Sequence, residues 1–220
     1  VPADDSVKLA IDAGADGIEH NAPLRSQDEQ TLKLMAQKGI SLMAGAGAFY
    51  IQRIDSTGFI DVIDPAQRRL FPEDLLSAIY DGIDSLHKQT FQMKSAGWDA
   101  KQRQARFVSE MQRARTAGVL LVFGTDCGAY GAIHGEQYKA LYGESRMGSS
   151  PMEAIVMATR DAAKSIGMAN ELGTIEEGKL ADILVIGANP LADLRNLHQV
   201  FRVIRSGEVY DPAELISERN

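Results

Sequence analysis

The chain has 220 residues, of which 45% are hydrophobic and 24% charged, so it can bury a core of ordinary size in one or two domains. Its formal net charge is −7, and it has no run of lysines and arginines, which argues against nucleic acid and an anionic membrane as partners. No apolar stretch reaches the length of a membrane span. The expected partners are therefore a small-molecule substrate and other protein subunits, including copies of this chain.

Cysteine usage and the first residues bear on the compartment. The one cysteine, Cys127, rules out an intramolecular disulfide and fits a reducing environment, so we expect a cytoplasmic location. No signal-peptide pattern opens the chain. Val1 is not a methionine, however, and residues 1–14 read almost at once as a helix. We therefore expect that a preceding segment is missing, and a leader could have been lost with it.

Three segments in chain order repeat one pattern, in which a helix-like stretch closes on a glycine and a short apolar run follows. They are IDAGADGIEH, MAQKGISLMAG and RARTAGVLLVFGTD, with the glycines at Gly14, Gly39 and Gly118. Glycine tolerates the left-handed backbone at a helix end. Short, continuously apolar runs are typical of parallel strands buried on both faces. The pattern predicts βα units, and hence an α/β fold with a parallel sheet.

Two helix starts can be placed from capping residues. Ser26 and Glu29 have the spacing of a capping box, and so do Ser150 and Glu153, with Pro151 in the first turn. The second of these helices has four apolar residues at helical spacing, Ile155, Ala158, Ala162 and Ile166. We expect that face to pack on the sheet.

Two regions break the repeated pattern. Between Tyr50 and Trp98 lies an extra segment, which reads as a loop followed by a helix in EDLLSAIYDGIDSLHKQTFQM. A long excursion after a strand often covers a site. After Gly167 the chain reads as short strands with turns at Glu177-Gly178 and Ser206-Gly207. That tail predicts a small β-structure appended to the α/β body.

Two polar residues stand at predicted strand ends. His20 ends GIEH and Asp126 ends VLLVFGTD, and ligands of α/β proteins bind where parallel strands end. An imidazole and a carboxylate that converge there suit zinc, which can acidify a bound water whose proton the carboxylate accepts. Taken singly, the histidine could be structural and Asp126 could cap a turn. Spacing alone therefore leaves both interpretations open.

The remaining candidates lie around the same loop. Cys127 has no adjacent base in the sequence, and buried cysteines are mostly inert packing residues, which argues against a nucleophile. His134, near Tyr130 and between glycines, is a better candidate for substrate contact. We expect surface positions for His87, in the extra helix, and for His198, in the tail.

Several of these segments together resemble the C-terminal half of the amidohydrolase superfamily, nearest its imidazolonepropionase and prolidase-like branch. They are AIDAGADGIEH, VLLVFGTDCGAYGAIHG, SPMEAIVMATRDAAKSIGM, GTIEEGKLADILVIGANPL and VFRVIRSGEVYD. The resemblance implies a TIM-like (β/α)8 barrel with a small β-sandwich. Residues 1–168 would be a partial barrel resembling strands six to eight, with the insertion at about 50–100, and residues 169–220 a sandwich segment.

The resemblance also implies roles for the candidate residues. His20 matches the metal-binding histidine of the sixth strand, and Asp126 matches the aspartate of the eighth, which binds metal and acts as general base. His134 corresponds more loosely to a loop histidine near the substrate. The resemblance implies one or two divalent metal ions as the cofactor, with zinc as the expected metal. The family's first-strand HxH pair and its fourth- and fifth-strand ligands have no counterparts here, so we expect an inactive, weakly zinc-binding fragment.

The implied function is hydrolysis of a C–N bond in an amide, cyclic amide or dipeptide-like substrate, through metal-activated water with Asp126 as base. The alternative is a noncatalytic binding module or degenerate half-barrel. A third possibility, a flavodoxin-like binding domain, predicts a glycine loop that cradles phosphate, and the sequence has no such loop.

Overall fold

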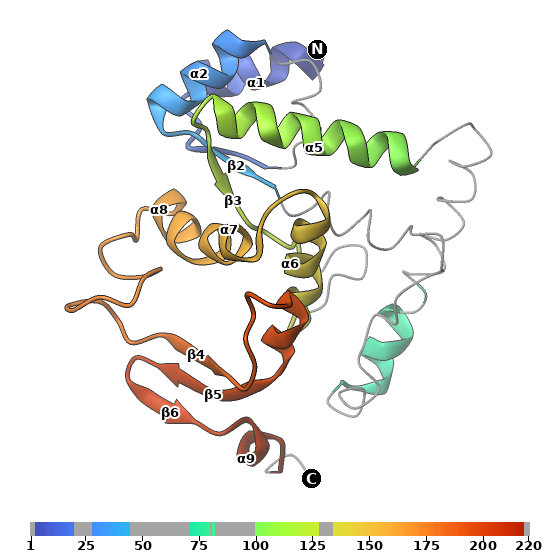
Figure 1. Ribbon diagram of the computed structural model, residues 1–220, viewed down its shortest axis with the longest axis vertical. Helices are drawn as coiled ribbons and strands as arrows, with labels where there is room; N and C mark the ends of the chain where they lie inside the picture. The colour runs from blue at the N-terminus through green and yellow to red at the C-terminus, as the bar shows by residue number, and fades with distance from the viewer. Residues whose placement is uncertain are drawn as a thin grey trace.

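Figure 1 shows the computed structural model of the chain, which describes residues 3–19, 28–44, 71–79, 81, 100–127 and 134–217. In chain order its elements are α1 (Ala3–Asp12), β1 (Gly17–Ile18), α2 (Glu29–Lys38), β2 (Ser41–Met43), α5 (Ala100–Thr116), β3 (Leu120–Val122), α6 (Gln137–Arg146), α7 (Pro151–Val156), the π-helical turn η3 (Met157–Asp161), α8 (Ala162–Ser165), β4 (Ile183–Ile186), the 3₁₀-helix η4 (Leu194–His198), β5 (Val200–Arg205), β6 (Glu208–Tyr210) and α9 (Pro212–Ser217). Within these ranges no helix is both long and apolar enough to cross a membrane.

The first three strands form a parallel sheet in the order β1-β2-β3. The helices before them end at glycines with left-handed backbone, with φ of 83° at Gly14, 70° at Gly39 and 82° at Gly118. A residue with a Cβ adopts this conformation only at a cost, which is why glycine stands at each helix end. The predicted βα units and the α/β fold are thus confirmed.

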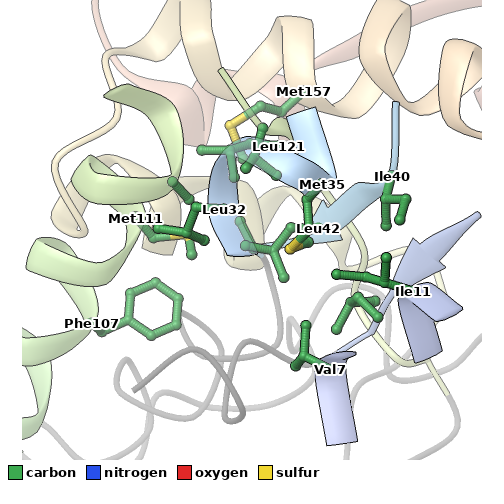
Figure 2. Close-up of a cluster of buried hydrophobic side chains, with 14 of the residues drawn as sticks. Val7, Ile11, Leu32, Met35, Ile40, Leu42, Phe107, Met111, Leu121 and Met157 are labelled. Atoms are coloured by element: carbon green, nitrogen blue, oxygen red, sulfur yellow. The ribbon is translucent and has the colours of Figure 1, made fainter. Parts of the chain in front are cut away.

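The main core lies between this sheet and helices α1, α2 and α5, which cover one side of it (Figure 1). Figure 2 shows the side chains that meet there: Val7, Ile11, Leu32, Met35, Ile40, Leu42, Phe107, Met111, Leu121 and Met157. Met35 and Leu42 are completely buried. Burying such a side chain stabilises the fold by about 1.5–3 kcal/mol, so this layer fixes how the strands lie.

Helix α2 begins two residues later than the predicted capping box. Its N-cap is Asp28, whose Oδ1 accepts a hydrogen bond from Thr31 N at 2.7 Å. Lys8 of α1 donates to Asp28 Oδ2 at 3.2 Å. Glu29 is therefore the first helical residue, whereas a capping box needs it at the third position; Ser26 itself lies outside the described residues. The prediction was wrong because Asp28 competes as a cap, and its carboxylate also meets a lysine from α1.

Helix α7 begins as predicted. Ser150 Oγ accepts from Glu153 N at 3.3 Å, and Glu153 Oε2 accepts from Ser150 N at 2.7 Å, which completes the capping box. The segment packs on the sheet as expected, since Phe123 N donates to Met157 O at 3.2 Å and Ser41 Oγ lies 2.9 Å from Ser165 Oγ.

The predicted apolar face of this segment is only partly right. Ile166 is 67% exposed, whereas the buried residues are Ala154, Met157 and Ala163. The π-helical turn η3 departs from the α-helical period and shifts the buried face by about one residue. As a result, Ala163 is buried at this point of the helix, whereas Ala162, the predicted residue, is half-buried.

The tail forms a second, antiparallel sheet in the order β4-β5-β6. The predicted turns are present at residues 177–178 and 206–207. Before β5, η4 inserts Leu194 into a cluster with Leu141 of α6 and Ala154 of α7, which joins the tail to the α/β body. The described residues show one small sheet here, and the expected sandwich would need a second.

Part of the insertion after β2 can be compared with its prediction. Residues 73–79 are helical, as expected, and Leu76 is buried. The rest of the predicted helix, including His87, lies outside the described residues, as does the predicted loop before residue 71.

Candidate functional site

The carboxyl ends of the three parallel strands lie along one edge of the first sheet. The chain leaves β1 at Glu19, β2 at Ala44 and β3 at Phe123, and Ala44 N donates to Val122 O at 2.8 Å. Parallel neighbours are about 4.8 Å apart, so the ends of β1 and β3 are separated by about 10 Å across β2. Long side chains that follow β1 and β3 can therefore reach a common ligand.

Asp126 follows β3 at this edge. It is exposed, and its φ of 54° is left-handed. In the described part of the chain only one other non-glycine residue has a positive φ, Ser206 in the hairpin turn between β5 and β6. Aspartate tolerates this conformation better than most residues, yet it still costs on the order of 1 kcal/mol. A strained carboxylate at a strand end is the type of feature that clusters at functional sites.

The neighbours of Asp126 include its adjacent cysteine. The Sγ of Cys127 lies 2.9 Å from Thr125 Oγ1, and the cysteine is half-buried. A threonine hydroxyl is too weak a base to generate the thiolate that a nucleophile requires. This contact fits the interpretation of Cys127 as a packing residue.

Two of the four predicted site residues lie in the described part of the chain, Asp126 and His134. His134 is exposed and follows Asp126 by eight residues in the sequence, and next to it Gly135 N donates to Gln137 Oε1 at 2.9 Å. His20 and Tyr130 lie outside the described residues. The convergence of His20 with Asp126, and of Tyr130 with His134, therefore stays a prediction.

A metal ion needs more ligands than the described residues bring together. Within those ranges, no group of three or more histidine, cysteine, aspartate and glutamate side chains could hold one. Asp126 offers an exposed carboxylate at the edge where the parallel strands end, and a carboxylate suits a divalent cation in charge and donor type. It supplies one ligand position, and His20 is the candidate for the next.

An ion pair that the sequence did not reveal lies at the start of α6, ten residues after Asp126. Glu136 precedes α6, is buried, and its Oε2 lies 2.6 Å from Lys139 Nζ one helical turn later. The signal was an acid three residues before a lysine at a helix start, which is common on solvated helices. Only tertiary packing buries the Glu136 carboxylate, and Lys139 beside it is half-buried.

His198 differs from its predicted surface position. It is half-buried in η4, and its ring centroid lies 5.0 Å from that of Tyr138 in α6. Arg195 of η4 stacks similarly over Tyr142 of α6, 5.0 Å from the ring centroid. His198 therefore belongs to the contact between the tail and α6, which the sequence pattern could not show.

These features define an α/β protein whose candidate site lies where parallel strands end and is carried by an aspartate after the third described strand. The chain belongs to the amidohydrolase family, whose pattern it matches over residues 3–210.

Individual relatives agree with this assignment. Ochratoxinase from Aspergillus niger is 27% identical over 208 residues, which cover 93% of this chain and 35% of the relative. Imidazolonepropionase from Symbiobacterium thermophilum is 48% identical over 40 residues, 18% of this chain and 9% of the relative. The predicted resemblance is thus confirmed.

Solved structures show the same relationship. A Xaa-Pro dipeptidase with methionine bound in its active site superposes with a TM-score of 0.62 and 28% identity, covering 94% of this chain and 43% of that one. The Aspergillus niger ochratoxinase structure gives a TM-score of 0.61 at 25% identity, covering 93% of this chain and 39% of that one. The chain thus spans less than half the length of these relatives.

Proposed function

We propose that the protein of which this chain forms at least a part hydrolyses a C–N bond in an amide, cyclic amide or dipeptide-like substrate. The observation that carries the proposal is Asp126. It has a left-handed backbone and an exposed carboxylate, and it follows a parallel strand in an amidohydrolase chain. The name of the Xaa-Pro dipeptidase relative supports dipeptide-like substrates in particular.

In this proposal Asp126 is the general base. A divalent cation, zinc in our proposal, would be held by His20 and Asp126 with further ligands, and would supply Lewis acidity toward the substrate carbonyl. Asp126 accepts the proton of the attacking water and delivers it to the leaving nitrogen as the C–N bond breaks. His134 and Tyr130, on the loop after Asp126, would contact the substrate.

The domain organisation is proposed on the same basis. Residues 1–168 would form part of a (β/α)8 barrel, with β1, β2 and β3 as its sixth to eighth strands. Residues 169–220 would contribute β4, β5 and β6 to a β-sandwich. The parallel and antiparallel sheets support this division, as does the limited share of each relative that the chain spans.

The replacement Asp126→Asn tests the proposed base. Asparagine also tolerates a left-handed backbone, so the fold should survive, but its amide cannot accept the proton of the water. In the complete enzyme, we expect turnover to fall by about 10²–10⁴-fold, the usual contribution of general acid–base catalysis. The measurement is kcat on a panel of Xaa-Pro dipeptides, N-acyl amino acids and cyclic amides, with the fold checked by circular dichroism.

The matched control is Cys127→Ser, which should leave turnover nearly unchanged. A loss of less than about tenfold in Asp126→Asn would count against the proposed base. If the cysteine variant lost turnover and the aspartate variant did not, a cysteine nucleophile would replace our mechanism.

A further inference from the structure

Just after β3, a side chain at residue 124 would overlap the side chain of Met43 in β2, so Met43 would have to shift to admit it. A Cβ atom on Gly124 would overlap Met43 Sδ and would lie 2.9 Å from Met43 Cγ. Carbon atoms in favourable contact are about 3.5–4.0 Å apart. The side chain of Met43 thus occupies the volume that a side chain at 124 would need.

Met43 is itself held in place. It is the last residue of β2, is 7% exposed, and forms a small cluster with Val122 and Leu120 of β3. Because side chains alternate along a strand, this cluster lies on the face opposite Leu42 and Leu121, which belong to the main core. Gly124 continues the row of Leu120 and Val122, which brings its backbone against Met43.

This contact lies two residues before Asp126. The chain has left β3 at Phe123, and between Gly124 and Asp126 it enters the left-handed conformation, with φ 54° at Asp126. Such a conformation persists only when the surrounding structure enforces it. The close approach of Gly124 to Met43 supplies a constraint of this kind on one side of the turn.

We propose that Met43 and Gly124 are positioning residues, whose contact fixes the backbone at residue 124 and so holds Asp126 in its left-handed conformation. The catalytic relevance of this contact rests on the proposed function, in which Asp126 is the base. The packing itself does not depend on that function.

The test is a double-variant cycle with Gly124→Ala, Met43→Ala and the two combined. The 13C shifts of Asp126 and its three-bond HN–Hα coupling report φ by NMR without any need for turnover. Gly124→Ala should move these signals away from the left-handed pattern. The combined variant should restore them, because alanine at 43 lacks both clashing atoms and the Cβ added at 124 occupies part of the space that the Met43 side chain fills. Unchanged signals in Gly124→Ala, or no restoration in the combined variant, would overturn the proposal.

Gly17→Ala is a matched control, since a Cβ there would lie 2.8 Å from Ser41 Oγ in the same sheet. Gly17 begins β1, at the opposite end of the strands from Asp126. The control should therefore lower stability without changing the Asp126 signals. If it changed them as much as Gly124→Ala does, the contact would have no specific positioning role.

Met43→Ala alone keeps the proposal testable if Gly124→Ala does not fold. Removing the Met43 side chain should speed amide hydrogen exchange at Asp126 and Cys127 severalfold, with little change at Ile18. Unchanged exchange at Asp126 would overturn the proposal.

Turnover separates this inference from the proposed function. If both hold, Gly124→Ala lowers kcat more than it changes KM, and the combined variant restores kcat. If the NMR cycle succeeds but Asp126→Asn retains full turnover, the contact stands and the proposed base is wrong. If the NMR cycle fails while Asp126→Asn loses turnover, the base stands and the positioning role is wrong.

Discussion

Glu144 is a carboxyl group enclosed by packed helices. It lies in α6, is 1% exposed, and its Oε1 accepts no hydrogen bond from the described part of the chain. Burial raises the pKa of Glu144 from 4.5 to about 7, and the charge of Arg115 offsets this only in part. The folded protein therefore keeps Glu144 protonated over a pH range in which the unfolded chain ionises it.

We expect stability to depend on pH through this residue. The folded state binds more protons than the unfolded chain between pH 4.5 and about 7, so stability is greatest below this window and falls as the pH rises through it. Glu144→Gln keeps the size of the side chain and cannot ionise. Above about pH 7 the variant should be more stable than the original by on the order of 3 kcal/mol.

Urea unfolding at a series of pH values from about 5 to 8 measures this difference. The control is Glu177→Gln, an exposed carboxylate in the turn before β4, which should leave the pH dependence unchanged. If the curves of the original chain and Glu144→Gln ran parallel, Glu144 would not be the linked group.

At the same scale, the sequence predicted where Asp126 lies in the chain but not its conformation. The apolar run VLLVF and the polar residues after it indicated a strand end. The left-handed φ of Asp126 and the approach of Met43 to Gly124 depend on how β2 and β3 register with each other, which a single sequence does not show.

Among the elements, α7 depends on its capping box. Ser150 Oγ accepts from the Glu153 backbone, and Glu153 Oε2 accepts from Ser150 N at 2.7 Å. Ser150→Ala removes the acceptor and should lower the free energy of unfolding by about 1 kcal/mol, as measured by urea denaturation. Ser150→Asp supplies another acceptor and should retain most of the stability. Equal losses in both variants would show that the cap contributes nothing specific.

Elements were predictable where one local rule was sufficient. Gly14, Gly39 and Gly118 end helices because the left-handed cap selects glycine, and Ser150 with Pro151 begins one. The prediction failed where tertiary contacts chose between local options. The actual α2 cap also bonds Lys8 of α1, and the π-helical turn η3 lies where Met157 accepts from Phe123 of the sheet.

At the scale of the whole molecule, the second sheet is incompletely covered. Cross-strand pairing places Leu184 on one face and Val185 and Val209 on the other, while Phe201 lies at the register shift between β4 and β5. All four side chains are exposed, Phe201 by 56% and Val209 by 61%. Apolar residues exposed on both faces of one small sheet are unusual in a monomer and mark a surface for association.

We therefore expect the 220-residue chain to self-associate through this sheet, with its apparent mass rising with concentration in sedimentation velocity. Phe201→Thr combined with Val209→Thr removes exposed apolar area from β5 and β6 while keeping residues suited to strands, so it should shift the chain toward monomer. Leu9→Gln is the control, because Leu9 is also an exposed apolar residue but lies on α1, which packs on the first sheet and not on β4, β5 and β6. A chain that stays monomeric at every concentration, or an equal response to the control, would show that the exposed faces do not drive association.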